Sequence, residues 1–170
     1  MKKAGIILLA FASLVISSCG VLASSDAAAD AAAAQLVADA LATGNLRIEV
    51  ETIIPSRGPS RTSFDGYYLS VKDGLAKSYL PFFGVSHAST IYGVDTIGIE
   101  FEDCPVEVRT DRSKASKGKY IWDFVAVSGK EKVAVSVTFF DNGTASISCN
   151  PEDRSPMSYN GRLVEFPRDK

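Results

Sequence analysis

The sequence is poor in the residue types that build catalytic and metal centres. Its 170 residues include one histidine, His87, and three cysteines. A zinc site takes several histidine or cysteine ligands at close spacing, which this composition does not supply. The G-x-G and G-K-[ST] signatures of dinucleotide and phosphate sites and the G-x-S-x-G turn of hydrolases do not occur. We therefore expect no metal, no cofactor and no catalytic residue, and we predict that the chain is not an enzyme.

Basic charge is also in short supply. The formal net charge is −2 at pH 7, and it becomes −4 without the two lysines near the N-terminus. A nucleic-acid-binding protein takes a strongly basic face, so we expect no nucleic acid partner. Basic residues gather at 109–119, where they fit a soluble hairpin tip or a contact to lipid phosphates. The acidic segment 95–107 lacks the spacing of a calcium loop and fits a solvated strand face.

The longest apolar run is too short to cross a membrane as a helix. It covers residues 4–16, whereas a hydrocarbon core takes about 20 residues. Met1-Lys2-Lys3 precedes the run and Ile16-Ser17-Ser18-Cys19 follows it, which is the order of a secretory signal. The final four residues resemble the bacterial lipobox. We predict that residues 1–18 are a lipoprotein signal peptide and that Cys19 is acylated. Several acyl chains on this one residue would meet the requirement that stable anchoring takes more than one chain.

The residues after Cys19 bear on where the lipidated chain resides. Gly20 rather than an aspartate follows the cysteine, and no acidic cluster comes immediately after it. In the Gram-negative bacteria that such a signal suggests, early acidic residues route lipoproteins to the cell surface. We therefore expect a lipid-anchored protein of the cell envelope, held in the outer membrane and facing the periplasm.

Alanine dominates the segment that follows, which predicts a helix between Ser24 and Asn45. Ser25 is the expected N-cap, and Gly44-Asn45 supplies the stop. The larger apolar residues share one face at helical spacing, namely Leu36, Val37 and Leu41. We expect residues 19–45 to form a tether and a helix whose C-terminal half docks on the rest of the protein.

After Asn45 the apolar period changes to two, which predicts strands. Asp73-Gly74 and Asn142-Gly143 are turn dipeptides, and Asp73-Gly74 suits a type I′ hairpin. The segment at 120–127 has large residues on both faces, so we expect it to be covered on both sides, with the helix on one. The predicted strands cover 46–54, 67–72, 75–80, 97–101, 104–109, 120–127, 132–140, 144–149 and 157–166.

Short polar connections between these strands favour antiparallel neighbours over parallel crossovers. Closure into a barrel would remove the exposed edges that an open sheet leaves. The predicted fold class is all-β: an antiparallel eight- to nine-stranded meander that closes into a barrel, with one N-terminal helix. Residues 46–170 form its single domain.

Four segments read together resemble a known family. They are Tyr67-Tyr68-Leu69-Ser70-Val71, Leu80-Pro81-Phe82-Phe83-Gly84, Asn142-Gly143-Thr144-Ala145 and Ser158-Tyr159-Asn160-Gly161-Arg162. In this order they are similar to the domain-of-unknown-function family 4251, small envelope lipoproteins of anaerobic Gram-negative gut bacteria. The likeness covers residues 46–166. It implies a calycin-like, lipocalin-like barrel and brings no activity with it.

The aromatic segment after the third predicted strand is the candidate contact site for a ligand or partner. It comprises Tyr79, Phe82 and Phe83, followed by Tyr92. Pro81 ends strand pairing, so two adjacent phenylalanines stand where the chain leaves the barrel. Both could plug the barrel end under the helix. Alternatively, the segment forms a hydrophobic ligand mouth or a partner patch.

Two functional classes follow from a barrel without catalytic signatures. In the first, the protein is a binding module that holds a small apolar ligand inside the barrel. In the second, it is a solid-cored structural or protein-interaction module of the envelope. The size of the inward side chains discriminates between them, because four large residues could fill an eight-stranded interior: Phe101, Trp122, Phe124 and Phe139.

Two thiols are left once Cys19 is acylated. Cys104 and Cys149 both end apolar-facing strand positions in a chain with an export signal, where disulfides persist. We predict a disulfide between them. The alternative is a pair of buried free cysteines.

Overall fold

The structure is a computed structural model that describes residues 21–85, 98–129 and 131–167. The predicted signal peptide, Cys19, His87 and Tyr92 lie outside these residues. Within them the chain forms the helix α1 (Val21–Thr43), the 3-10 helix η1 (Ala115–Lys117) and the strands β1 (Leu46–Pro55), β2 (Arg61–Thr62), β3 (Tyr68–Lys72), β4 (Leu75–Pro81), β5 (Gly98–Pro105), β6 (Arg109–Asp111), β7 (Lys119–Ser128), β8 (Glu131–Phe140), β9 (Thr144–Pro151) and β10 (Met157–Leu163).

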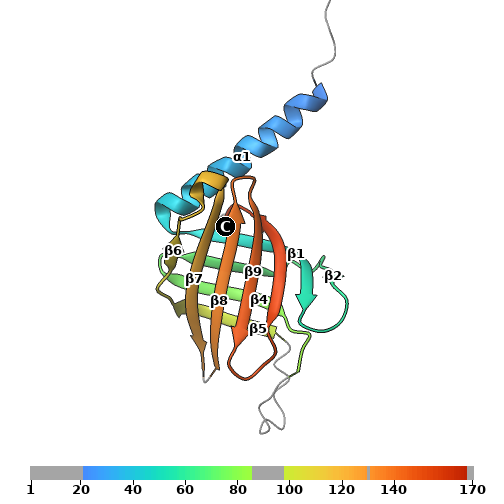
Figure 1. Cartoon of the computed structure of the whole chain (residues 1–170), viewed down its shortest axis with the longest axis vertical. Coiled ribbons are helices and arrows are strands. Elements are labelled where there is room, and N and C mark those ends of the chain that lie inside the picture. The colour runs from blue at the N-terminus through green and yellow to red at the C-terminus, as the bar shows by residue number, and fades with distance from the viewer. Residues whose placement is uncertain (1–20, 86–97, 130, 168–170) are drawn as a thin grey trace, which may run out of the picture.

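All described strand pairs are antiparallel, in the order β5-β4-β3-β1-β10-β9-β8-β7-β6, with β2 attached to β1. The chain is therefore an up-and-down meander in which the first long strand pairs with the last. The sheet curls into a half-barrel in which β7 to β9 run across β1, β3, β4 and β5 (Figure 1). The predicted fold class, mostly β with one helix, is confirmed.

The two ends of the sheet meet at a seam that Cys104 helps to join. Its Sγ lies 3.2 Å from the backbone N and 3.3 Å from the backbone O of Val127 on β7. The short β6 pairs with residues 121–123 of β7. The Cys104 sulfur on the edge strand β5 thus provides a hydrogen-bond partner for backbone groups of β7 that β6 does not pair.

Strand alternation places the core inside the curl. On β8, Val133, Val135, Val137 and Phe139 are buried, as the period of two predicts. The prediction that both faces of β7 are covered is wrong. Its outward Val125 and Val127 are 52% and 51% exposed, because α1 covers an end of the barrel rather than this face.

Turn chemistry explains where the strands end. Asp73 and Gly74 both have positive φ, 52° and 76°, as the predicted type I′ turn requires. The predicted strand at 104–109 is instead divided between β5 and β6. Pro105 cannot donate to a ladder, and the Val106 N–H bonds to the Gly74 carbonyl at 2.9 Å, so the chain turns away from β5.

The helix ends where the sequence predicts and docks by its C-terminal half. Gly44 has φ +74°, and its N–H donates to the Ala40 carbonyl at 2.9 Å. Val37 and Ala40 are buried, whereas the alanine-rich first half projects beyond the barrel (Figure 1). Ser25 lies inside α1 rather than at its N-cap, since the helix already runs from Val21. No helix of the described residues is long and apolar enough to cross a membrane.

Candidate binding surfaces

The predicted aromatic segment does not form one surface. Tyr79 points outward from β4, is 46% exposed and packs against Tyr67 at 5.2 Å between ring centroids. Phe82 is half-buried against the core, whereas Phe83 is 38% exposed with the Arg61 guanidinium 4.4 Å from its ring. The fourth residue, Tyr92, lies outside the described residues. The three described rings therefore face the outer sheet surface, the core and the solvent respectively.

A buried arginine closes the end of the barrel where Phe82 lies. Arg154, 8% exposed, donates from Nε and Nη2 to the two carboxylate oxygens of Glu131 at 2.7 and 2.6 Å. Its Nη1 donates to the Gly98 carbonyl at 2.8 Å, and the guanidinium lies 4.8 Å from the Phe82 ring centroid. Bidentate arginine–carboxylate pairs combine two charge-assisted hydrogen bonds, each stronger than a neutral one. The predicted contact residue Phe82 is thus part of a closed end.

This end lies opposite the helix. A Cβ placed on Gly143, in the hairpin between β8 and β9, would lie 3.1 Å from Ala33 of α1. Arg154 instead belongs to the connection between β9 and β10, at the other end of β9. The expectation that both phenylalanines plug the barrel under the helix is therefore wrong. The sequence offers no local signal for Arg154, whose partners are 23 and 56 residues away.

Two titratable groups are buried beside this closed end. The Tyr159 hydroxyl donates to the Pro81 carbonyl at 2.8 Å, and burial raises the pKa of Tyr159. Burial raises the pKa of the Cys149 thiol to about 12, with the nearby positive charge of Arg154 acting in the opposite direction. A thiol with such a pKa is protonated at neutral pH and is a poor nucleophile.

The predicted disulfide is not formed, because both Cys104 and Cys149 are free thiols in the structure. Cys104 faces Val127 across the seam, whereas Cys149 lies on β9, opposite Val135 of β8 and Met157 of β10. Counted across the seam, where Cys104 contacts β7, the strands β7 and β8 lie between the two cysteines, and along the sheet in the other direction four strands do. Strands lie about 4.8 Å apart, so this placement exceeds the reach of about 7 Å between Cα atoms that a disulfide tolerates.

Large side chains fill the interior of the curl. Four large residues distinguish a barrel that holds a ligand from a barrel with a solid core. All four are 0–5% exposed: Phe101, Trp122, Phe124 and Phe139. Trp122 and Phe139 meet edge to face at 5.5 Å between centroids, and Tyr120 packs on Phe139 at the same distance. Such geometry is typical of a packed aromatic core.

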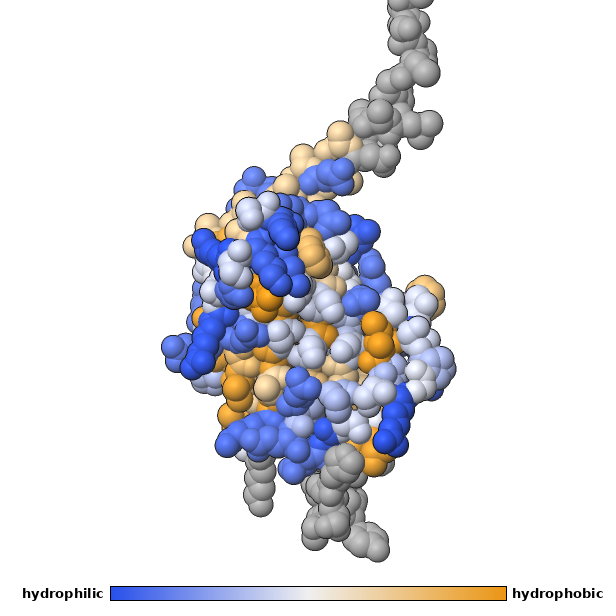
Figure 2. All heavy atoms as spheres, viewed as in Figure 1, coloured by the Kyte–Doolittle hydropathy of each residue, from blue (hydrophilic) through white to orange (hydrophobic). Residues whose placement is uncertain are grey.

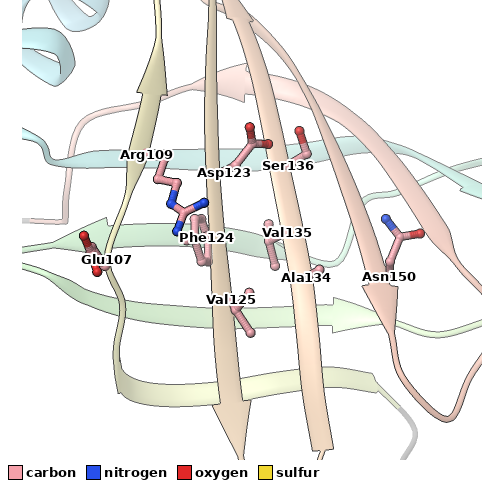
Figure 3. Close-up of a pocket in the computed structure, with 9 residues that line it drawn as sticks. All are labelled: Glu107, Arg109, Asp123, Phe124, Val125, Ala134, Val135, Ser136 and Asn150. Atoms are coloured by element: carbon pink, nitrogen blue, oxygen red, sulfur yellow. The ribbon is translucent and has the colours of Figure 1, made fainter.

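An open groove crosses the outward face of β7 to β9 (Figure 3). Its sides carry Glu107 and Arg109 at one edge and Asn150 at the other, with Val125 and Ala134 between them. Figure 2 shows apolar patches interrupted by hydrophilic residues on this side of the molecule. The groove therefore mixes side chains of both charges with exposed valine.

The charged segments singled out in the sequence have structural roles. Arg112 donates to the Leu41 carbonyl of α1 at 2.9 Å, so the basic segment supports the C-terminal end of the helix. Glu100 and Glu102 are exposed on β5, as expected of a solvated strand face. Within the described residues, no three histidine, cysteine or acidic side chains come together in a way that could hold a metal ion.

The fold and these surfaces define a mostly β protein whose antiparallel sheet curls into a half-barrel capped by one helix. A family model, Domain of unknown function (DUF4251), matches residues 28–163, and the chain belongs to this family. The matched range includes most of α1. A crystal structure of a DUF4251 family protein from Bacteroides eggerthii has a similar fold, with a TM-score of 0.60 and 18% sequence identity. The alignment covers 81% of this chain and 90% of that one. None of the curated proteins matches the sequence.

Proposed function

We propose that this chain is a lipid-anchored protein of the cell envelope that binds other molecules on its outer surface and does not catalyse a reaction. The observation that supports this proposal is the filled interior. Phe101, Trp122, Phe124 and Phe139 are all buried within the curl. Small-molecule pockets take about 300–1,000 Å³ of largely apolar space, and packed aromatic rings occupy this region instead.

Both ends of the barrel also argue against a ligand inside it. The Arg154–Glu131 pair and Phe82 close one end, while Val37 and Ala40 of α1 are buried at the other. Opening the first end would break the two charge-assisted hydrogen bonds between Arg154 and Glu131. Of the two classes that the sequence leaves open, the solid-cored interaction module is therefore the one we propose over the small apolar ligand carrier.

The membrane arrangement rests on the lipobox-like sequence that ends at Cys19. An acylated Cys19 would hold the chain in the outer membrane, facing the periplasm. The projecting half of α1 would then separate the barrel from the bilayer by roughly 20 Å, at about 1.5 Å per helical residue. A body held away from the lipid leaves its outer faces accessible to large partners.

The solid core is tested by overpacking it. Ala126 is buried in the interior, whereas Ala134 is exposed on the neighbouring strand, so Ala126→Leu and Ala134→Leu form a matched pair. In a filled core we expect Ala126→Leu to lower the free energy of unfolding by about 1–3 kcal/mol, and Ala134→Leu to change it little. Urea unfolding measures both. An Ala126→Leu variant as stable as the parent would indicate internal space and support the ligand carrier instead.

The anchor is tested with Cys19→Ala in the full chain. Acyl burial contributes about 0.8 kcal/mol per methylene, so we expect the variant to leave the membrane fraction in moderate salt while retaining its β circular dichroism. A folded variant that still sediments with membranes would show that the attachment lies elsewhere in the chain.

A further inference from the structure

The outward face of β1, β3, β4 and β5 carries two tyrosines between two glutamates. Tyr68 and Tyr79 are direct cross-strand partners, with Glu49 opposite Tyr68 and Glu100 opposite Tyr79. We call this row, together with the neighbouring row Arg47, Ser70 and Lys77, the tyrosine face. Side chains on these cross-strand positions lie close enough to act on one ligand.

The rings of the tyrosine face are held in place by their neighbours. The Arg47 guanidinium lies 3.9 Å from the Tyr68 ring centroid, and Tyr67 supports Tyr79 from the side. Tyr79 nevertheless remains 46% exposed. Rings fixed before binding lose little conformational freedom when a ligand packs on them, so the arrangement is preorganised.

Two adjoining grooves lie over these residues. One groove is lined by Tyr68, Lys77, Tyr79 and Glu100, and a second groove extends from it along Arg47, Ser70, Lys72 and Phe166. The two grooves share Tyr68 and Lys77. An extended ligand could therefore follow the surface from β5 to Phe166, beyond the end of β10.

Three of the four charged side chains of this face take part in ion pairs, whereas Glu100 is in none of the ion pairs between the described residues and is open to accept hydrogen bonds. Arg47 lies 3.9 Å from Glu49, and Lys77 lies 3.2 Å from Asp103 and 3.6 Å from Glu102. A polyanion or polycation would have to compete with these partners, and an apolar surface would desolvate them without compensation. A neutral ligand with many hydroxyl groups avoids both penalties, because carboxylates accept and lysine or arginine donate hydrogen bonds without separating the pairs.

We propose that the tyrosine face binds a neutral carbohydrate chain. A sugar ring presents apolar C–H groups that pack on the exposed Tyr79 ring, beside the Tyr68 ring that Arg47 covers, and hydroxyls at its rim that reach Glu49, Glu100 and Lys77. Tyrosine suits such contacts because it combines a large apolar ring with a polar tip. The inference rests on the proposed outer-surface binding and is independent of the lipid anchor.

The test measures binding of the purified full chain, in mild detergent, to immobilised glycans. The panel comprises neutral polymers of different sugars and linkages, namely dextran, amylose, β-glucan, mannan and galactan, with dextran sulfate and poly-L-lysine as charged comparisons. We expect binding to at least one neutral polymer that exceeds binding to both charged polymers. No binding to any neutral polymer, or tighter binding to either charged one, would overturn the proposal.

Variants then assign the site. Tyr79→Ala should weaken binding at least tenfold and Glu100→Gln several-fold, whereas Tyr79→Phe, which keeps the ring, should retain most of it. Phe140→Ala is the matched control, because Phe140 is a 37% exposed aromatic residue on β8, outside the tyrosine face. Thermal unfolding confirms that each variant is folded. Equal binding by parent and Tyr79→Ala would refute the assignment, while the Ala126→Leu measurement would still report on the solid core.

Discussion

The two ends of the half-barrel are closed by different means. At one end α1 lies against the hairpin between β8 and β9 and buries Val37 and Ala40. At the other end Arg154 joins Glu131 and the Gly98 carbonyl beneath Phe82. The first closure uses a local element with a small apolar contact. The second unites three distant parts of the chain through a buried charge.

This difference predicts two kinds of stability. A docked helix can detach while the sheet remains folded, because local units open with free energies below that of global unfolding. The Arg154 end cannot open without breaking the hydrogen bonds by which Arg154 joins β8 and β5 to the connection between β9 and β10. We therefore expect changes at the Arg154 end to affect global unfolding and changes at the helix end to affect local opening.

The largest effect is expected from Arg154→Ala. Removing one partner of a buried ion pair costs about 3–5 kcal/mol, and the 24% exposure of the Glu131 side chain favours the lower limit, about 3 kcal/mol. Arg162→Ala is the matched control, because Arg162 pairs with Glu51 at 3.3 Å while both side chains are about 60% exposed. Such a surface pair contributes less than about 1 kcal/mol. Urea unfolding compares them, and equal losses would contradict the proposed difference.

The same end should make the fold sensitive to alkali. Burial raises the pKa of Cys149 from 9.0 to about 12, so between these values the unfolded thiol ionises while the folded thiol stays protonated. The contribution of the protonated Cys149 thiol to the free energy of unfolding is complete below pH 9. It then falls by about 1.4 kcal/mol per pH unit until the pH reaches the pKa of the folded thiol, about 12. Cys149→Ala should reduce the slope of stability against pH in this window. An unchanged slope would exclude Cys149 as a source of the alkaline loss.

The helix end shows what sequence reasoning captures. The stop at Gly44-Asn45 and the docking face of Leu36, Val37 and Leu41 depend on neighbouring residues, and both predictions agree with the structure. The Asp73-Gly74 turn and the alternation along β8 are local in the same sense. Periodicity and turn chemistry carry this information because their spacing is fixed by the backbone.

The Arg154 end shows what sequence reasoning could not provide. Arg154 stands in a polar connection and resembles any exposed arginine until β5 and β8 are brought beside it. The disulfide prediction is wrong for the same reason, since spacing along the chain does not reveal that, even across the seam, two strands separate Cys104 from Cys149. The tyrosine face likewise depends on the register of four strands, although Tyr79 alone was recognised from its sequence context.

At the helix end, Val37→Ala should have a moderate and local effect. Losing two buried methyl groups costs about 1.6 kcal/mol at about 0.8 kcal/mol per group. The amides of α1 should then exchange with deuterium faster, while those of β8 and β9 keep the protection of the parent protein. Faster exchange spread evenly over the sheet would show that the helix and the sheet unfold together.

The smallest expected effect compares one glycine from each end. Gly44 and Gly129 have φ of +74° and +62°, and a Cβ added to either would meet nothing within 4 Å. Alanine at either position is therefore strained by its backbone alone, by about 1 kcal/mol. The backbone strain should affect a different measurement in each of the two variants. In Gly44→Ala the end of α1 can relax by fraying, so deuterium exchange of the helix should increase more than the urea midpoint falls. In Gly129→Ala the hairpin that places Glu131 opposite Arg154 cannot relax separately, so the full strain should appear in global unfolding. Identical behaviour of the two variants would mean that both ends belong to one cooperative unit.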